Sequence, residues 1–454
     1  MVFKNVFSEY SSMQYVVDHL QITSALGRSW LMNTPFMTDE ALLEEELELV
    51  QRMRNLLVDE EHKDLFRTIH EQFCQLNDIR PTVALMNGGV VFDDIQLFEI
   101  KKTAIIANRV SLMLARLSCA DFQLEEMSAL IDILDPERTG IPHFYVYSAY
   151  SETLRALREQ MRACEDVDEK ERLRFQAEGE EDAVRAKLTE QIGVFQKALM
   201  RNLETLAHLD VTMAKAQLAI AWRACRPTVT AKTRLSQLRN PEVDEILQSQ
   251  GRQFQPIDIA YGQETVLVTG ANMAGKSVLL KTLSLAQYLL QFGFFIPAEQ
   301  AEMALVDEVI TSIGDNQSEY SGLSSFAVEI LTIDRIIKTA KQGVRVLALV
   351  DELARTTNPE EGKRLVNGFI RMAQTLAVTA VVTTHYSGIH TDCRRLRVRG
   401  LRLDGQQSVT ARNISNYMDY SLVETTDDEV PKEALTIAEL LGVDADFIRI
   451  AREE

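Results

Sequence analysis

Residues 270–277 read Gly-Ala-Asn-Met-Ala-Gly-Lys-Ser and match the pattern G-x-x-x-x-G-K-[ST], between a β-branched run and a helical pattern. The glycines let such a loop curl so that backbone N–H groups point at a phosphate, and the following helix N-terminus adds partial positive charge. Lys276 is placed to reach the β- and γ-phosphates of a nucleotide, and Ser277 to bind Mg²⁺. The pattern thus predicts a phosphate-binding loop rather than a glycine-rich turn with a surface lysine.

Two carboxylates and a histidine extend this chemistry. Asp351 and Glu352 follow the apolar run 346–350, about 75 residues after the loop. Asp351 is expected to hold Mg²⁺ through water, and Glu352 to orient or deprotonate an attacking water. His385 ends the next apolar run, where it can contact a γ-phosphate. A hydrogen-bonded histidine at a strand end is an equally good interpretation of His385.

The elements that must position these residues alternate between strand and helix. Strands are expected over 266–269, 344–350 and 376–384, and helices over 276–292 and 361–374. This alternation predicts βα units and a mostly parallel sheet. Residues 1–225 instead read as successive helices. We therefore expect a mixed fold, an all-α region over 1–225 followed by an α/β domain over 226–454, with the boundary at about residue 226.

The helical half carries several separate predictions. Apolar periodicity indicates helices over 39–58, 104–117 and 125–134. A short aromatic run, 144–147, has β-strand character. Residues of about 150–205 form a short helical arm, and the charged stretch 166–182 suggests a hairpin with its tip near Gly179. The alternative for this stretch is an exposed surface helix without function.

Composition limits the function classes. The chain has 454 residues, with 48 Lys+Arg against 67 Asp+Glu and a net charge of −19, which argues against a protein that coats phosphate backbones non-specifically. No run of about 18 apolar residues exists, so no membrane span is expected. The five cysteines form no CxxC pair. A disulfide framework or zinc site is therefore not expected, and a cytoplasmic location fits.

The motifs resemble those of a known family. The strings TGANMAGKS, LVDELARTTNPEEG and TTHYSG are similar to those of the MutS family of mismatch-repair ATPases, which belong to the ABC class. The resemblance continues through Leu209-Asp210-Val211, through 293–298 and through the C-terminal TIAELLGVDADFIRIARE. It is specific over 209–454 and weaker over 15–208. It implies an ABC-type P-loop ATPase domain that uses ATP and Mg²⁺.

The family's site residues carry over one at a time. The resemblance puts Asp351 and Ser277 at the Mg²⁺, Glu352 at the water, Lys276 at the phosphates and His385 at the γ-phosphate. Phe254 matches an aromatic residue near the adenine, although a core position is an even alternative. Residues 314–326 match the signature loop, in which Ser324 or Ser325 would reach the partner subunit's nucleotide; Leu323 replaces the family's basic residue. The nucleotide-binding set is Gly270, Ala271, Asn272, Met273, Ala274, Gly275, Lys276, Ser277, Val278, Phe254, Ser324 and Ser325.

The resemblance also implies a homodimer with composite ATP sites, because a signature loop acts on the partner's nucleotide. What that dimer would act on stays open. No stretch resembles the family's mismatch-reading domain or an Smr domain, and we read Phe7-Ser8-Glu9 as a coincidental match to the mismatch wedge. The arginines between 394 and 402 are interpreted as a solvated strand edge. One function is ATP-driven lever movement on DNA, with weak binding and no mismatch preference; the alternative is remodelling of a protein partner.

Overall fold

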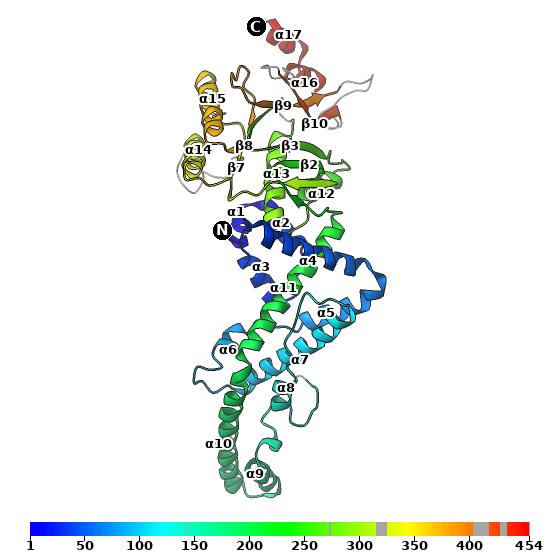
Figure 1. The fold of residues 1–454 in the computed structure, drawn as a ribbon, viewed down its shortest axis with the longest axis vertical. Coiled ribbons are helices and arrows are strands. Elements are labelled where there is room, and N and C mark those ends of the chain that lie inside the picture. The colour runs from blue at the N-terminus through cyan, green and yellow to red at the C-terminus, as the bar shows by residue number, and fades with distance from the viewer. Residues whose placement is uncertain (142, 272–273, 315–324, 403–416, 427–433, 454) are drawn as a thin grey trace.

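Helix α11 (Gln196–Ala221) forms the spine of the helical part in the computed structural model (Figure 1). It packs against α3 (Ala25–Asn33) and α4 (Glu40–Val58). Asp210 on α11 accepts hydrogen bonds from the backbone N–H of Thr23 (3.1 Å) and of Ser24 (2.8 Å), so it holds the start of α3. This contact gives the Leu209-Asp210-Val211 motif a structural role. The structure describes residues 1–141, 143–271, 274–314, 325–402, 417–426 and 434–453, without the side chains of Ser325 and Ala434.

The other N-terminal helices follow the expected apolar periodicity. Asp39 caps α4 by accepting from the N–H groups of Ala41 and Leu42, and Asp93 forms a capping box with Gln96 at the next long helix. The helices expected over 39–58, 104–117 and 125–134 are confirmed as α4, α7 and α8. The remaining bounds are α1 (Phe3–Glu9), α2 (Ser11–His19), α5 (Lys63–Phe73), α6 (Arg80–Ala84), α7 (Asp94–Arg116) and α8 (Ser128–Leu134).

The aromatic run 144–147 forms no strand, so that expectation is wrong. Lys101, fully buried on α7, donates to the carbonyl oxygen of His143 at 2.9 Å and pairs with Asp135 at 3.2 Å. Tyr147 also lies within 3.3 Å of the Lys101 Nζ. The backbone is thus bent around a buried cation, which prevents the extended pairing that β-propensity alone would favour.

The arm is a hairpin of two helices, α9 (Glu152–Ala163) and α10 (Val167–Ile192), at the end of the molecule opposite the C-terminus (Figure 1). Its tip is formed by residues 164–166, because Asp166 caps α10 by accepting from the N–H of Glu169. Gly179 lies inside α10. The prediction of a tip near Gly179 is therefore wrong: one glycine in a long, well-capped helix lowers helix propensity but does not end the helix.

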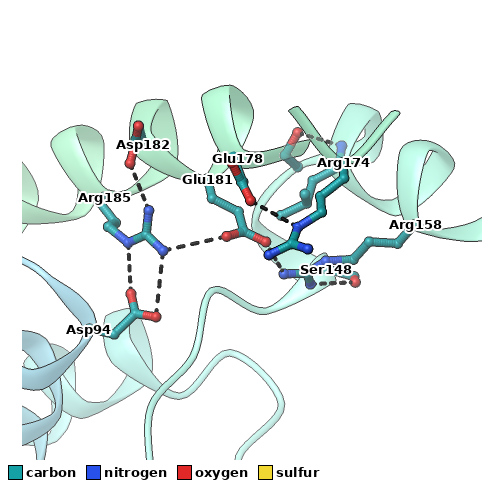
Figure 2. Close-up of polar contacts among 10 residues, drawn as sticks. Asp94, Ser148, Arg158, Arg174, Glu178, Glu181, Asp182 and Arg185 are labelled. Carbon is teal, nitrogen blue, oxygen red and sulfur yellow. Dashed lines mark hydrogen bonds and ion pairs between the residues drawn. The ribbon is translucent and has the colours of Figure 1, made fainter. Parts of the chain in front are cut away.

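Charged contacts brace the base of the arm (Figure 2). Arg185 of α10 lies 2.7 Å from Asp94 at the start of α7, and Arg158 of α9 lies 2.7 Å from Glu181. Arg158 also donates to Ser148 Oγ at 3.0 Å. The Arg185–Asp94 pair connects the hairpin to α7, the bond to Ser148 connects it to the segment before α9, and the Arg158–Glu181 pair holds α9 and α10 together.

The second half contains two sheets. The larger has the order β10-β9-β4-β8-β7-β6, in which every pairing is parallel except that of β10 with β9. A smaller sheet has the order β1-β5-β2-β3. The expected strands 266–269, 344–350 and 376–384 are confirmed as β4, β7 and β8, and the expected helices as α13 and α15. The boundary at about residue 226 stays a prediction.

The bounds of these elements are as follows. The strands are β1 (Thr228–Val229), β2 (Thr233–Leu238), β3 (Ile257–Tyr261), β4 (Thr265–Thr269), β5 (Gln300–Met303), β6 (Glu308–Ser312), β7 (Val346–Val350), β8 (Thr379–Thr384), β9 (Arg394–Leu401) and β10 (Met418–Glu424). The helices are α12 (Pro241–Ser249), α13 (Lys276–Gln291), α14 (Ser325–Lys341), α15 (Pro359–Thr375), α16 (Ala434–Leu440) and α17 (Ala445–Glu453).

A buried lysine connects the two halves. Lys215 of α11 donates to Glu46 Oε1 of α4 and to the carbonyl oxygen of Phe292, each at 2.7 Å. Phe292 directly follows α13, the helix that begins at Lys276. Burial raises the pKa of Glu46, but Lys215 and His208 outweigh it and bring the pKa to about 2. Helices α4 and α11 therefore hold the far end of the helix that starts at the predicted phosphate loop.

Lys215→Met is expected to lower the free energy of unfolding by ~3–5 kcal/mol at pH 7, because it leaves the Glu46 carboxylate buried without its main partner. Urea unfolding measures this change. Lys197→Met, at an exposed position on the same helix, is the matched control and is expected to change stability by less than ~0.5 kcal/mol. An equal effect of both substitutions would contradict the pairing.

The pH dependence of stability tests the same pair. The pKa of Glu46 is depressed to about 2 in the folded chain, so the unfolded chain binds the proton more tightly. The resulting stabilisation is fully present above the unfolded pKa of about 4.3 and is lost as pH falls towards 2. In Glu46→Gln this part of the acid destabilisation is expected to disappear.

Candidate active site

The predicted phosphate loop connects β4 to α13 and lies at the carboxyl edge of the parallel strands. Gly270 is buried, and a Cβ there would lie 3.2 Å from the Cβ of Val398. Gly275 has φ +76°, and a Cβ there would lie 3.0 Å from Cδ1 of Tyr420. Close approach at one position and positive φ at the other therefore favour glycine. Ala271, Ala274 and Val278 are described, whereas Asn272 and Met273 lie outside the described residues.

The ammonium group of Lys276 is folded into this loop. Its Nζ donates to the carbonyl oxygens of Gly270 at 2.7 Å and Ala271 at 3.2 Å, and it lies 3.0 Å from Glu352 Oε1. The residue is only 5% exposed. A lysine held at the mouth of a curled loop is suited to an anion. That Lys276 contacts a phosphate stays a prediction.

Oxygen atoms gather around Asp351, the residue after β7. Ser277 Oγ donates to one carboxylate oxygen of Asp351 at 2.5 Å, and Thr383 Oγ1 donates to the other at 2.6 Å. Sequence analysis did not identify Thr383, although it stands two residues before His385. Ser277 and Asp351 thus present adjacent oxygen ligands, which is the ligand type that Mg²⁺ takes.

Glu352 lies between the side chains of Lys276 and His385. Its backbone is left-handed, with φ +47°, and its N–H donates to Thr383 Oγ1 at 3.1 Å. Its second carboxylate oxygen is 3.6 Å from His385 Nδ1, an ion-pair rather than a hydrogen-bond distance. His385 and then Lys276 outweigh burial and lower the pKa of Glu352 to about 2. The site therefore holds an ionised carboxylate at neutral pH.

An apolar cavity of about 560 Å³ adjoins the loop. Phe254 and Tyr420 line it together with Gly275 and Val278 of the loop. Phe254 also packs against the hydrophobic core, so both interpretations of this residue retain support. Tyr420 was missed because it lies on β10, and no sequence signal connects that strand with the loop. The cavity has room for a nucleobase beside the phosphate loop.

Neither of the two predicted signature-loop serines has a described side chain. Ser324 lies outside the described residues, and Ser325 is described only as the first residue of α14. Their proposed contact with a partner subunit stays a prediction.

The arginine-rich stretch 394–402 is not a strand edge, so that interpretation is wrong. β9 lies between β4 and β10 and pairs with both. Arg394 bonds Glu424 at 2.6 Å and Arg402 pairs with Asp419, while Arg395 donates to the carbonyl oxygen of Thr391 at 3.2 Å. Several of these arginines therefore already bind carboxylates or a carbonyl oxygen within the chain.

Comparison with known proteins agrees with this architecture. Residues 266–454, which include the loop, Asp351, Glu352 and His385, match MutS domain V. Proteins named Endonuclease MutS2 are also similar: 35% identity over 212 residues in Levilactobacillus brevis, and 30% over 283 residues in Pediococcus pentosaceus. Over residues 266–454 the chain is therefore similar to the MutS family.

The chain spans about a quarter to a third of the length of those relatives. The aligned residues cover 46% of the chain and 26% of the Levilactobacillus brevis protein, and 60% of the chain and 34% of the Pediococcus pentosaceus protein. Another Endonuclease MutS2, from Leuconostoc mesenteroides, is 30% identical over 289 residues, 62% of the chain and 34% of that protein. The predicted MutS resemblance is confirmed, and the mixed helix-and-sheet fold agrees with it.

Membrane-spanning helices and clusters of metal-binding side chains are both absent from the described residues. These residues contain no helix whose length and apolar content would let it span a bilayer. They also contain no group of three or more His, Cys, Asp or Glu side chains arranged to hold a metal. The second result is compatible with Mg²⁺, which in nucleotide sites takes one or two protein oxygens and completes its shell with water and phosphate.

Proposed function

We propose that this chain is a member of the MutS family and a Mg²⁺-dependent ATPase of the P-loop class, with a lever region over 1–225 and an ATPase domain over 226–454. The observation that supports it most is the meeting of Lys276, Ser277, Asp351 and Glu352 at one edge of the sheet, within 3.0 Å of one another in pairs. These residue types are the ones that phosphoryl transfer to water requires.

The residues of the site fit both Mg²⁺ and ATP. Ser277 Oγ and the Asp351 carboxylate would hold Mg²⁺, directly or through water, and the ion would neutralise charge on the phosphate oxygens. The glycine-bearing loop would bind the phosphates through its N–H groups, and the cavity beside Phe254 and Tyr420 would take the base. Val278, at the start of α13, lines that cavity near the loop.

Each side chain then has a part in hydrolysis. Glu352 accepts a hydrogen bond from the attacking water, whose oxygen bonds to the γ-phosphorus as the bond to ADP breaks. The water's proton passes to Glu352. When Lys276 turns from Glu352 to the γ-phosphate, one of the two groups that lower the Glu352 pKa is withdrawn, so the pKa rises and the carboxylate becomes a better base. His385 stays beside Glu352 and faces the γ-phosphate.

We further propose that two copies form composite sites, with Ser324 or Ser325 of one copy at the nucleotide of the other. Exposed apolar side chains support self-association: Leu441, in the turn between α16 and α17, is 40% exposed, and Phe447 and Ile450 on α17 are 60% and 53% exposed. ATP would then close the levers of the dimer on DNA. DNA binding is expected to be weak and without mismatch preference.

Remodelling of a protein partner is the second candidate function. The arm residues 152–192 carry 12 acidic and 8 basic side chains, counted from the sequence, so their net charge is −4. Several of the basic ones already pair with arm carboxylates, as Arg158 does with Glu181 (Figure 2). A surface of this charge repels a phosphate backbone and suits a protein client better than DNA.

DNA binding separates the two functions. We expect Kd for plain duplex of ~10⁻⁶ M or weaker at physiological salt, with a log–log salt slope of about −0.9 for each phosphate contact and no more than a few-fold mismatch preference. Fluorescence anisotropy at several salt concentrations measures both quantities, with the ATPase rate recorded alongside. A hundred-fold preference for a mismatch would contradict this expectation. If no DNA changes the ATPase rate, the protein-client function is favoured.

A further inference from the structure

The turn that follows β7 is strained in two places. Glu352 has φ +47° and Ala354 has φ +62°, although neither is glycine. L-residues adopt this left-handed region only when the surroundings hold them there. The direction of the Glu352 side chain depends on this turn, so whatever holds the turn also aims the carboxylate.

Two side chains from outside the turn hold Ala354. The Tyr386 hydroxyl donates to the Ala354 carbonyl oxygen at 2.7 Å, and the Ala354 N–H donates to Glu329 Oε2 at 3.0 Å. Ala354 is fully buried, so solvent cannot replace either contact. Both backbone polar groups of this residue are therefore fixed by side chains.

Tyr386 is itself fixed. It is 6% exposed, and its N–H donates to Thr384 Oγ1 at 3.1 Å. Gly362 of α15 packs so closely that a Cβ there would lie 2.4 Å from the Tyr386 hydroxyl oxygen. Burial, and then Glu329 and Glu352, raise the pKa of Tyr386, so its hydroxyl keeps the proton that it donates.

Glu329 lies on α14, four residues after the first residue of that helix. Through this side chain, α14 contacts the backbone two residues after Glu352. A displacement of α14 would move Glu329 and release the Ala354 N–H, and the strained turn would then relax.

We propose that Glu329 and Tyr386 are positioning residues for Glu352: they hold the 352–354 turn in its strained form, and Glu329 makes hydrolysis depend on where α14 lies. This inference rests on the proposed ATPase function.

The test compares three substitutions in the full chain. Glu329→Ala removes the acceptor and Tyr386→Phe removes the donor, and each is expected to lower kcat by ~10-fold or more with KM within about twofold, because a misaimed group affects the chemical step more than binding. Glu329→Gln keeps a carbonyl acceptor and is expected to restore most of kcat. Asp334→Ala is the control: it removes an exposed ion pair with Lys338 on the same helix and should match wild type.

A double-mutant comparison distinguishes positioning from general damage. If Glu329 acts through Glu352, adding Glu329→Ala to Glu352→Gln should not lower the residual rate further. Urea unfolding confirms that each variant is folded at the assay temperature. The proposal is overturned if Glu329→Ala turns over ATP like wild type, if Glu329→Gln is as slow as Glu329→Ala, or if Glu329→Ala slows Glu352→Gln by its full factor. In each of these outcomes wild-type turnover still supports the ATPase; loss of wild-type turnover itself would instead contradict the proposed function.

Discussion

Glu352→Gln is expected to bind ATP with near wild-type affinity and to turn it over ~10²-fold more slowly or worse. Glutamine keeps the shape of the side chain and its hydrogen bond to water, but it cannot accept a proton. The ionised state of Glu352, with its pKa near 2, is the property that this substitution removes. Phosphate release under saturating Mg-ATP measures kcat, and equilibrium binding of ATP measures affinity.

The matched control is Glu360→Gln. Glu360 is an exposed carboxylate in the first turn of α15, where it pairs with Lys363 at 3.1 Å. Its loss is expected to leave kcat and affinity unchanged. Equal turnover in Glu352→Gln and wild type would show that another group activates the water.

Lys276→Ala is expected to weaken ATP binding by ~10-fold or more and to abolish measurable turnover, because hydrogen bonds to charged groups each contribute ~1.5–3 kcal/mol. The affinity loss arises from the missing contact with the phosphates. The turnover loss has a second cause: the ammonium group no longer stabilises charge on the γ-phosphate as its bond breaks. Titration with a fluorescent ATP analogue measures the first effect, and phosphate release measures the second.

Lys281→Ala is the control for this substitution. Lys281 is exposed on the same helix, α13, five residues further along. It should bind and hydrolyse ATP like wild type. If both alanine variants lose affinity equally, the cause is the general charge of the helix and not a specific phosphate contact.

Local sequence patterns were sufficient to predict the elements around the site. The G-x-x-x-x-G-K-S pattern lies between β4 and α13, and the two carboxylates follow β7. These elements are predictable because each depends on a short run of consecutive residues. The residues that support the site could not be found this way. Thr383 and Tyr386 lie within two residues of His385 in the sequence, but their partners, Asp351 and Ala354, belong to a distant segment. Glu329 and Tyr420 also reach the site from segments far from it in the sequence.

The errors have the same origin. A glycine within a charged stretch predicts a turn near Gly179, whereas the Asp166 cap starts an uninterrupted helix. The arginines of β9 were assigned to an edge because alternating charge is typical of solvated strands. β10 pairs with β9, so β9 is not an edge strand. Which strands are neighbours in a sheet cannot be deduced from the residues of one strand alone.

Phosphate release from ATP by the purified wild-type chain tests the ATPase function most directly. The assay uses saturating ATP with Mg²⁺ or with EDTA, and Lys276→Ala purified in parallel gives the background. We expect Mg²⁺-dependent release well above that background. Release by wild type equal to that of Lys276→Ala, or unaffected by EDTA, would contradict an ATPase built on Lys276, Ser277, Asp351 and Glu352.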